Sequence, residues 1–410
     1  MLNDNSFELG QDLVDYINDS PTMYNAVENV RLWLDEYNFE RLDLAEEWKL
    51  VKGVNSSSIF AFVVVGDRIE KEGFRIIGSH TDSPGFKLKP NPEIKQRQYL
   101  KLNIEPYGGM ILSTWMDRPL SLAGRVFTRN IEDSFRPIEH IIKLDRPICM
   151  IPNLAIHMNR SINEGYAYNK QDDMAPIVLE SYDGDEKNYI RSLILREINM
   201  SGKEKISLED ILDYDLYLYE FEKGSLVGDE KEYISCGRLD NLASVHASIS
   251  ALLYSDSLGR SVCNEDIDIN SFRNVLSINE AGIDQPVQTK AKFEGIKLVA
   301  AFNNEEVGSQ TRQGADSQLL INILERIALG LGKTKSQLLR SYESSFMISA
   351  DLAHAVHPNK SAVADPTNRP VFAGGPTIKS HAGQAYASDA YSVAVYKDIC
   401  DRNQIPDLCQ

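Results

Sequence analysis

The sequence predicts an α/β fold in which helices cover both faces of a mixed sheet. Two longer segments, 238–255 and 318–332, carry apolar residues at helical spacing. Short apolar runs bounded by Gly or Ser are typical of strands that are buried on both faces. The chain has four such runs, namely SSIFAFVVVG (57–66), GFRIIGSH (73–80), IKLVAAF (296–302) and SSFMISA (344–350). Because strands and helices alternate along the chain, we expect a sheet sandwiched between helices.

The chain opens with two predicted helices. Residues 7–36 have apolar positions at helical spacing, and the pattern is interrupted at the sequence DSPT. Ser20 or Thr22, on either side of Pro21, is typical of a helix cap. We therefore expect one helix to end and another to begin at this point.

The middle of the chain differs in texture from its two flanks. Residues 89–235 predict short strands punctuated by Pro and Tyr, and segment 215–226 alternates at period two. We interpret this stretch as an inserted β-rich domain, with residues 1–88 and 236–410 forming the main, discontinuous domain. Within the second part, residues near 254–296 are polar enough to predict a long excursion.

Composition limits the class of protein. The 410 residues are 42% hydrophobic and 25% charged, enough for at least one large core. The net charge of −17 argues against non-specific binding to nucleic acid or to anionic lipid. No window approaches the roughly 18 to 20 apolar residues of a membrane span, and the first residues lack signal-peptide character. The five cysteines lack C-x-x-C spacing, which fits a reducing compartment, so we expect a cytoplasmic protein. The acidic net charge favours small molecules or peptides as its ligands.

Potential metal ligands lie next to apolar runs in four places. Because the carboxyl ends of strands line the ligand crevice of an open α/β sheet, we expect such side chains to converge there. Hard oxygen ligands together with imidazole suit zinc, cobalt or manganese. The four groups are His80 with Asp82, Asp240 alone, Glu305 with Glu306, and Asp351 with His354 and His357.

Each of these groups also has an interpretation without a metal. Asp351 and His354, three residues apart, could share a helical face and still serve only the core. The alternatives are a turn at Asp82, a helix cap at Asp240, a solvated acidic pair at Glu305 and Glu306, and core positions for His354 or His357. All four groups together favour a metal site over these separate explanations.

The chemistry that these residues predict is hydrolysis. A carboxylate such as Asp240 could bridge two cations about 3.5 to 4 Å apart, and a bound cation lowers the pKa of its water to about 7. Neighbouring side chains on an extended backbone diverge, so one of Glu305 and Glu306 could bind metal while the other faces that water. An uncoordinated glutamate can pass the proton to a leaving amine.

Eight motifs make the chain resemble a known family. They are DSPTMYNAVE, GSHTDSPGFKLKP, YGGMILSTWMDRPLSLAGRV, IPNLAIHMNRSINEG, RLDNL, NNEEVGSQTRQGADS, ISADLAHAVHPN and GGPTIKS. Their order is that of the aspartyl aminopeptidase family, which includes vacuolar aminopeptidase I. The resemblance implies a cocatalytic dizinc aminopeptidase with a phosphorylase/hydrolase-like catalytic domain and an inserted dimerisation domain at residues 89–235. It also implies peptide substrates and a homo-oligomer built from dimers, up to a dodecamer.

The resemblance also implies a role for each motif residue. One zinc ion would be bound by His80, Asp240 and Asp351, while Asp240 would bridge to a second zinc ion that Glu306 also binds. The other roles are Glu305 as general base and acid, Asp82 as a support for the ligands, His157 as a residue that reaches a neighbouring subunit's site, and Lys379, His354 and His357 as substrate-binding residues. The alternatives are a core histidine for His157 and a surface lysine for Lys379.

The match to the family is incomplete at the end of the sequence. The family continues beyond the point that matches ICDRNQIPDLCQ and includes a Met-His-Ser motif that completes the second zinc site. Only Asp240 and Glu306 are left for that ion here, whereas three protein ligands are usual. An incomplete sequence, a degenerate gene product or a one-metal short form would each explain this. We expect a metalloaminopeptidase acting on acidic or neutral N-terminal residues. The alternatives are a non-catalytic oligomer subunit and a metal-dependent deacylase.

Overall fold

The computed structural model describes most of the chain. The described residues are 4–44, 48, 52–53, 58–180, 186–201, 205–261, 293–406 and 408–409. Most of the predicted excursion at 254–296 therefore lies outside them. By its internal contacts the chain divides into two compact units, Met1–Ala350 and Asp351–Gln410, and each is described by itself.

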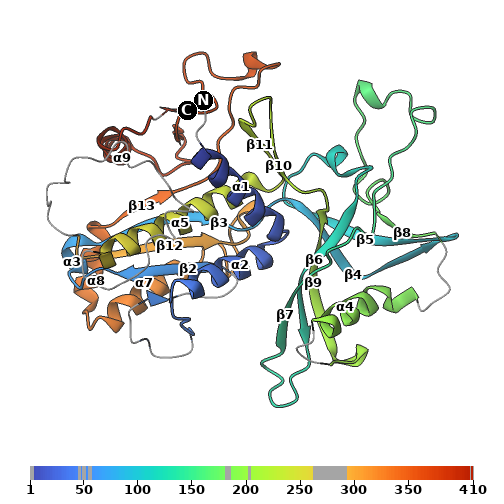
Figure 1. Cartoon of the computed structure of the whole chain (residues 1–410), viewed down its shortest axis with the longest axis horizontal. Coiled ribbons are helices and arrows are strands. Elements are labelled where there is room, and N and C mark those ends of the chain that lie inside the picture. The colour runs from blue at the N-terminus through green and yellow to red at the C-terminus, as the bar shows by residue number, and fades with distance from the viewer. Residues whose placement is uncertain are drawn as a thin grey trace. The chain divides into compact units, whose positions relative to one another are not determined.

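The first unit contains the mixed sheet that the sequence predicts (Figure 1). Its strand order is β1-β2-β12-β3-β13. Strand β12 runs antiparallel to β2 and parallel to β3, and β13 runs parallel to β3. The strands are β1 (Lys52–Gly53), β2 (Ile59–Val64), β3 (Phe74–His80), β12 (Ile296–Phe302) and β13 (Phe346–Ser349). Each of the four predicted apolar runs thus forms a strand of this sheet.

Helices cover both faces of this sheet, as expected. Alternate side chains of β2 point in opposite directions, so Ile59 packs with α1, α2 and α5 while Phe60 packs with α7 and α8. Hydrophobic residues therefore form one core on each side of the sheet. The helices of this unit that pack on the sheet or at its edge are α1 (Asp4–Asp19), α2 (Met23–Glu36), α3 (Ile69–Glu72), α5 (Leu239–Ser261), α7 (Leu319–Gly330) and α8 (Lys335–Glu343).

The break between the first two helices is capped as predicted. Thr22 is the residue before α2, and its side-chain oxygen accepts a hydrogen bond from the backbone N–H of Asn25 at 3.5 Å. Such a cap satisfies one of the free amides at a helix start, a contribution of about 1 kcal/mol. Ser20 instead accepts a hydrogen bond from the side chain of Asn29.

A second, six-stranded antiparallel sheet occupies the middle of the chain, with the order β7-β6-β9-β4-β5-β8. Helix α4 (Tyr189–Met200) packs on one face through its apolar residues. The strands are β4 (Gly85–Gln96), β5 (Tyr99–Tyr107), β6 (Leu120–Thr128), β7 (Ile138–Lys143), β8 (Ile177–Leu179) and β9 (Ile211–Glu220). Strands β10 (Ser225–Val227) and β11 (Tyr233–Ser235) form a separate antiparallel hairpin. Several strands are longer than the short ones expected. Strand β4 continues through Pro90 and Pro92 with a register shift, because proline lacks the N–H that the ladder needs.

The second unit has little regular structure. It contains β14 (Thr377–Ile378), which runs parallel to β15 (Leu408–Cys409), and helix α9 (Ala390–Arg402), which begins with a capping box formed by Asp389 and Ser392. The prediction that Asp351 and His354 share a helical face is wrong, because residues 351–357 are irregular. Their backbone pairs elsewhere, with the N–H of Val356 donating to the carbonyl of Pro370.

In the described part of the chain, no helix has both the length and the apolar character needed to cross a membrane.

Candidate metal centre

The candidate site lies where two neighbouring parallel strands end. Strands β3 and β12 are in register, and His80, the last residue of β3, is paired with Phe302, the last residue of β12. Strand β4 starts at Gly85, so only residues 81–84 separate the two sheets along the chain. The segment after β12 carries Glu305 and Glu306. Parallel pairing therefore brings residues that are more than two hundred positions apart to one edge of the sheet.

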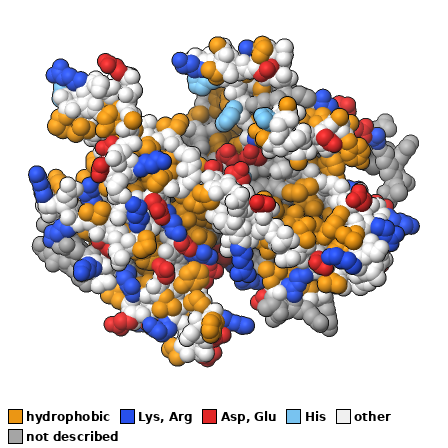
Figure 2. Space-filling view, turned by 180° about the vertical axis from the view of Figure 1, so that it is seen from behind, with side chains coloured by type: hydrophobic (Ala, Val, Ile, Leu, Met, Phe, Trp, Pro, Cys, Tyr) orange, Lys and Arg blue, Asp and Glu red, His pale blue; other side chains and the backbone are white. Residues whose placement is uncertain are grey.

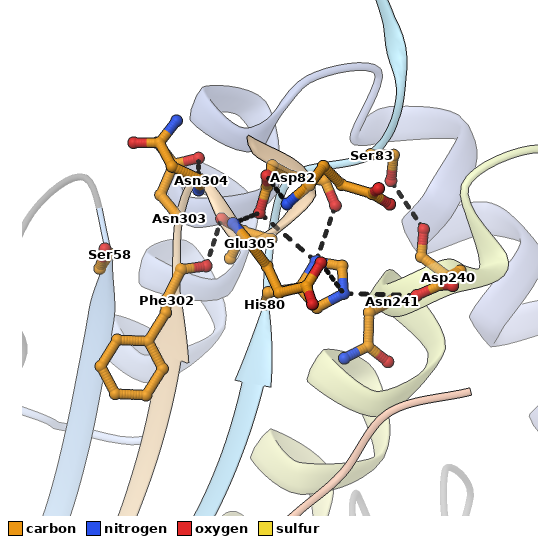
Figure 3. Close-up of polar contacts among 12 residues, drawn as sticks. Ser58, His80, Asp82, Ser83, Asp240, Asn241, Phe302, Asn303, Asn304 and Glu305 are labelled. Atoms are coloured by element: carbon orange, nitrogen blue, oxygen red, sulfur yellow. Dashed lines mark hydrogen bonds and ion pairs between the residues drawn. The ribbon is translucent and has the colours of Figure 1, made fainter. Parts of the chain in front are cut away.

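His80 is at the centre of this site (Figure 3). Its side chain is only 5% exposed, and its Nδ1 lies 2.9 Å from the backbone carbonyl oxygen of Asp82. A carbonyl can only accept, so Nδ1 carries the proton and Nε2 keeps its lone pair. Nε2 lies 3.3 Å from Oδ1 of Asp240 and 3.9 Å from Oε2 of Glu305. The imidazole is thus oriented to offer Nε2 to a cation held among carboxylates.

Asp82 is fully buried and holds the surrounding backbone in place. Its Oδ2 accepts hydrogen bonds from the Tyr107 hydroxyl at 2.7 Å and the Glu306 N–H at 3.1 Å, while its Oδ1 accepts from the Glu305 N–H at 3.2 Å. Burial raises the pKa of Asp82, but hydrogen bonds from His80 and Tyr107 outweigh this and bring the pKa below its usual value. The Asp82 carboxylate therefore bonds the backbone at Glu305 and Glu306, which is distant in sequence, and not the turn in which Asp82 itself lies.

The two glutamates lie on a single 3-10 turn, η6 (Glu305–Val307), that follows the left-handed residue Asn304 (φ 64°). The extended backbone expected here is wrong, because the chain turns directly after β12. Ligand atoms of His80, Glu305 and Glu306 all lie within 4.8 Å of one another. Burial, then the negative charges of Asp240 and other nearby carboxylates, raise the pKa of Glu306 to about 7, although His80 lowers it in part. The cluster thus has excess negative charge.

Asp240 joins the cluster from the start of α5. Residues Asp240 and Asn241 have non-helical dihedral angles, and the peptide bond between them is cis. The Ser83 hydroxyl donates to the Asp240 carbonyl at 2.8 Å, and the Asn241 amide donates to the carbonyl of Ala350 at 2.8 Å. With its backbone held in this way, the half-exposed carboxylate of Asp240 points toward His80 (Figure 3).

The donor set fits a zinc ion. Tetrahedral zinc with bonds of about 2.1 Å places two of its ligand atoms about 3.4 Å apart. The distance from His80 Nε2 to Asp240 Oδ1 is 3.3 Å. One imidazole and several carboxylates are ligands that zinc accepts, and the side chains of Asp240 and Glu305 are 53% and 52% exposed. An ion and a substrate could therefore reach the site from solvent.

Comparison with known proteins decides the family. Residues 16–272 and 277–408 match the family described as aminopeptidase I zinc metalloprotease, M18. The chain belongs to the M18 family. It is therefore a metallopeptidase, and the resemblance that the motifs predict is confirmed.

Two relatives show how far the similarity to M18 aminopeptidases extends. The probable M18 family aminopeptidase 2 of Clostridium novyi (strain NT) is 42% identical over 410 residues, which covers 98% of this chain and 85% of the relative. The protein of the same description from Clostridium acetobutylicum is 43% identical with the same coverage.

Solved structures confirm the α/β fold of this M18 chain. The cryo-EM structure of the Ape4 and Nbr1 complex is similar with a TM-score of 0.83 and 31% identity, covering 98% of this chain and 74% of that chain. The structure of Chaetomium thermophilum mApe1 has a TM-score of 0.80 and 25% identity, covering 99% of this chain and 86% of that one.

The predicted substrate-binding residues of this M18 protein lie in its second unit. Lys379 is 21% exposed, and its ammonium donates to Oδ2 of Asp351 at 2.7 Å and to the carbonyl of Leu352 at 2.8 Å. Lys379 is therefore an anchored side chain rather than a mobile surface lysine. His354 and His357 are exposed, so the interpretation as core histidines is wrong. Their predicted role in substrate binding stays a prediction.

His157 of this M18 chain lies in an exposed turn, away from any strand. The interpretation as a core histidine on a strand is therefore wrong. In the described part of the chain, no hydrogen bond or ion pair of the His157 side chain links it to the His80 site. Its predicted action in a neighbouring subunit stays a prediction.

Sequence reasoning missed two polar residues of the M18 site. Tyr107 donates to Asp82, and the Asn304 side-chain amide donates to the Tyr107 hydroxyl at 2.8 Å. Both residues end or follow strands, Tyr107 before two glycines and Asn304 directly before the glutamate pair. Their position at strand ends is the same signal that indicates His80 and Glu305.

Proposed function

We propose that this chain is a zinc aminopeptidase that removes an acidic or neutral residue from the N-terminus of peptides. The observation that carries the proposal is the oriented His80 imidazole, whose Nε2 faces the carboxylate of Asp240 at 3.3 Å. Membership of a zinc metalloprotease family supports the choice of metal and reaction. The proposal includes the preference for acidic or neutral residues, two zinc ions at the site, and the ability of cobalt or manganese to replace zinc.

In this reaction the residues of the chain have separate roles in binding the metal, orienting its ligands and transferring protons. His80, Asp240 and Glu306 would hold the metal, and the backbone carbonyl of Asp82 keeps the His80 ring in the right tautomer. Zinc, when bound, supplies a Lewis acid that polarises the scissile carbonyl and acidifies water. Glu305 Oε2 lies 3.9 Å from His80 Nε2, beyond the spacing of about 3.4 Å expected for two ligands of one ion. Glu305 is therefore placed to take a proton from the attacking water and donate it to the leaving amine.

The test is metal-dependent release of N-terminal residues. Purified protein is stripped with a chelator, reloaded with zinc, cobalt or manganese, and assayed on peptides that begin with Asp, Glu or Leu. We expect turnover that depends on metal and requires a free α-amino group, and a loss of about 10²- to 10⁴-fold in Glu305→Gln. Bound zinc without turnover would contradict the proposal and favour a non-catalytic subunit. Turnover of α-N-acylated substrates would favour a deacylase.

We also propose that the chain forms a homo-oligomer through its inserted β-rich domain. Large apolar side chains are strongly exposed in this stretch, including Ile131 at 94%, Phe135 at 97% and Met158 at 70%. Figure 2 shows broad hydrophobic areas on the face drawn there. Exposed large apolar side chains are typical of protein interfaces when they lie together in one patch. The mApe1 protein of S. cerevisiae forms a dodecamer, and the same assembly is proposed here. Sedimentation of the full chain tests it, and a monomer at micromolar concentration would contradict it.

The remaining assignments stay predictions. These are the division into domains at residues 89 and 235, the ligand role of Asp351, and a cytoplasmic location.

A further inference from the structure

Tyr107 connects the six-stranded sheet to the candidate metal centre. It is the last residue of β5, and its hydroxyl donates to Oδ2 of Asp82 at 2.7 Å. The same hydroxyl accepts a hydrogen bond from the side-chain amide of Asn304 at 2.8 Å. Tyr107 thus links a strand of one sheet to the turn that follows a strand of the other.

The Tyr107 ring is held firmly on its own side. It packs edge-on against Tyr217 of β9, with 5.6 Å between the ring centroids. The next residue, Gly108, has φ +71°, and a Cβ there would lie 3.1 Å from the Cβ of Glu306. Glycine therefore allows β5 to end directly against the glutamate turn. Because the ring is packed in this way, the Tyr107 hydroxyl has little freedom to move away from its hydrogen bond with Asp82.

Asp82 in turn contacts His80, Glu305 and Glu306, the residues of the candidate metal centre. Its carboxylate accepts from the backbone of Glu305 and Glu306, and its Oδ1 lies 3.4 Å from His80 Nδ1. Residues that hold a metal ligand in place from behind typically change metal affinity or activity by about 10- to 100-fold when they are altered. Tyr107 stands one hydrogen bond further out and acts on Asp82 itself.

We propose that Tyr107 is a positioning residue of the metal centre, which fixes Asp82 and thereby the orientation of His80 and of the Glu305–Glu306 turn. The six-stranded sheet then helps to set the geometry of the site through Tyr107, in addition to any role in assembly. This inference rests on the proposed function, because it concerns the same site. Asn304 completes the arrangement by keeping the Tyr107 hydroxyl turned toward Asp82.

The experiment compares two tyrosine-to-phenylalanine variants in the full chain. Tyr107→Phe removes the hydroxyl at the site. Tyr219→Phe is the matched control, because its buried hydroxyl donates to the carbonyl of Leu144 at 2.8 Å in the same sheet and does not touch the site. Zinc affinity is measured by competition with a chromophoric chelator, and the visible spectrum of the cobalt-loaded protein reports ligand geometry. Thermal unfolding of the metal-free protein reports stability.

We expect both variants to lose similar stability, since each loses one buried hydrogen bond. Only Tyr107→Phe should bind zinc about tenfold more weakly, the lower end of the usual range, and change the cobalt spectrum. Its kcat should fall while KM stays near that of the wild type. Equal zinc affinity in the two variants would overturn the inference and leave the proposed function standing. Zinc binding by the wild type without hydrolysis would overturn the proposed function, and the affinity comparison would still decide the inference.

Asn304→Gly provides a second route to the same answer if Tyr107→Phe folds poorly. Glycine tolerates the left-handed backbone at this position and removes the amide that holds the Tyr107 hydroxyl. We expect weaker zinc binding of about the same size, with little further loss when both changes are combined, because both act on one hydrogen-bond chain. Fully additive losses in the double variant would contradict a shared path through Asp82.

Discussion

Replacing Asp82 by Asn tests how much the buried carboxylate contributes to the stability of the protein and to its affinity for zinc. The backbone N–H groups of Glu305 and Glu306 donate to different oxygens of this side chain. An amide has one oxygen and one NH₂ group, so either orientation leaves an N–H donor facing another donor. An unpaired donor costs about 1 to 3 kcal/mol, and the remaining bonds lose the strength that a charged acceptor gives them. We expect the metal-free protein to lose about 2 to 4 kcal/mol of unfolding free energy.

The same change should weaken zinc binding by about 10- to 100-fold, because the Glu305–Glu306 turn loses one of its anchoring bonds and the group 3.4 Å from His80 Nδ1 loses its charge. The assays are urea unfolding of the metal-free protein and chelator competition for zinc. Asp213→Asn is the matched control, since Asp213 is exposed on β9. In the described part of the chain its carboxylate accepts a hydrogen bond only from the N–H of Tyr214. If Asp82→Asn matched this control in both assays, the view of Asp82 as the support of the site would be refuted.

Three further predictions concern other groups. Burial raises the pKa of Asp215, but its lysine and arginine partners lower it below the usual value, so its stabilising effect is present above about pH 3.9 and lost as pH falls through the lowered pKa. Asp215→Asn should therefore lower stability at pH 7 and flatten its acid dependence in urea titrations. Glu306→Gln should weaken zinc binding, whereas Glu305→Gln should mainly lower kcat, and the reverse pattern in chelator competition would exchange their roles. His157→Gln should lower kcat with zinc affinity unchanged, and a wild-type kcat would contradict its predicted role.

The sheet of the first unit was predictable because its strands are short apolar runs with polar residues directly after them. Strands buried on both faces need such runs, and a catalytic residue at a strand end interrupts them. His80 ends β3 and the glutamates follow β12, so one local pattern indicated both the strands and the site. The general rule for open sheets predicts that these strand ends converge, whereas the direct pairing of β3 with β12 is known only from the structure.

The parts that could not be predicted depend on contacts between distant segments. Nothing around Tyr107 shows that its hydroxyl meets Asp82, because that contact depends on how two sheets pack. The irregular backbone after β13 is a similar case, since its spacing fits a helix but Val356 pairs with Pro370 instead. The 3-10 turn at Glu305 follows from the left-handed conformation of Asn304, which the sequence allows without requiring it.

The short connection between β3 and β4 has a consequence for motion. Within residues 81–84, Thr81 bonds the Phe302 carbonyl, Asp82 supports the site, and Ser83 bonds the Asp240 carbonyl. A swing of the six-stranded sheet about this connection would break the bonds of Tyr107 to Asp82 and Asn304 and disturb the groups that Asp82 holds. The connection therefore holds the two sheets together at the site and does not act as a hinge. Any opening that admits a peptide or releases a product must come from segments that leave this crossing undisturbed.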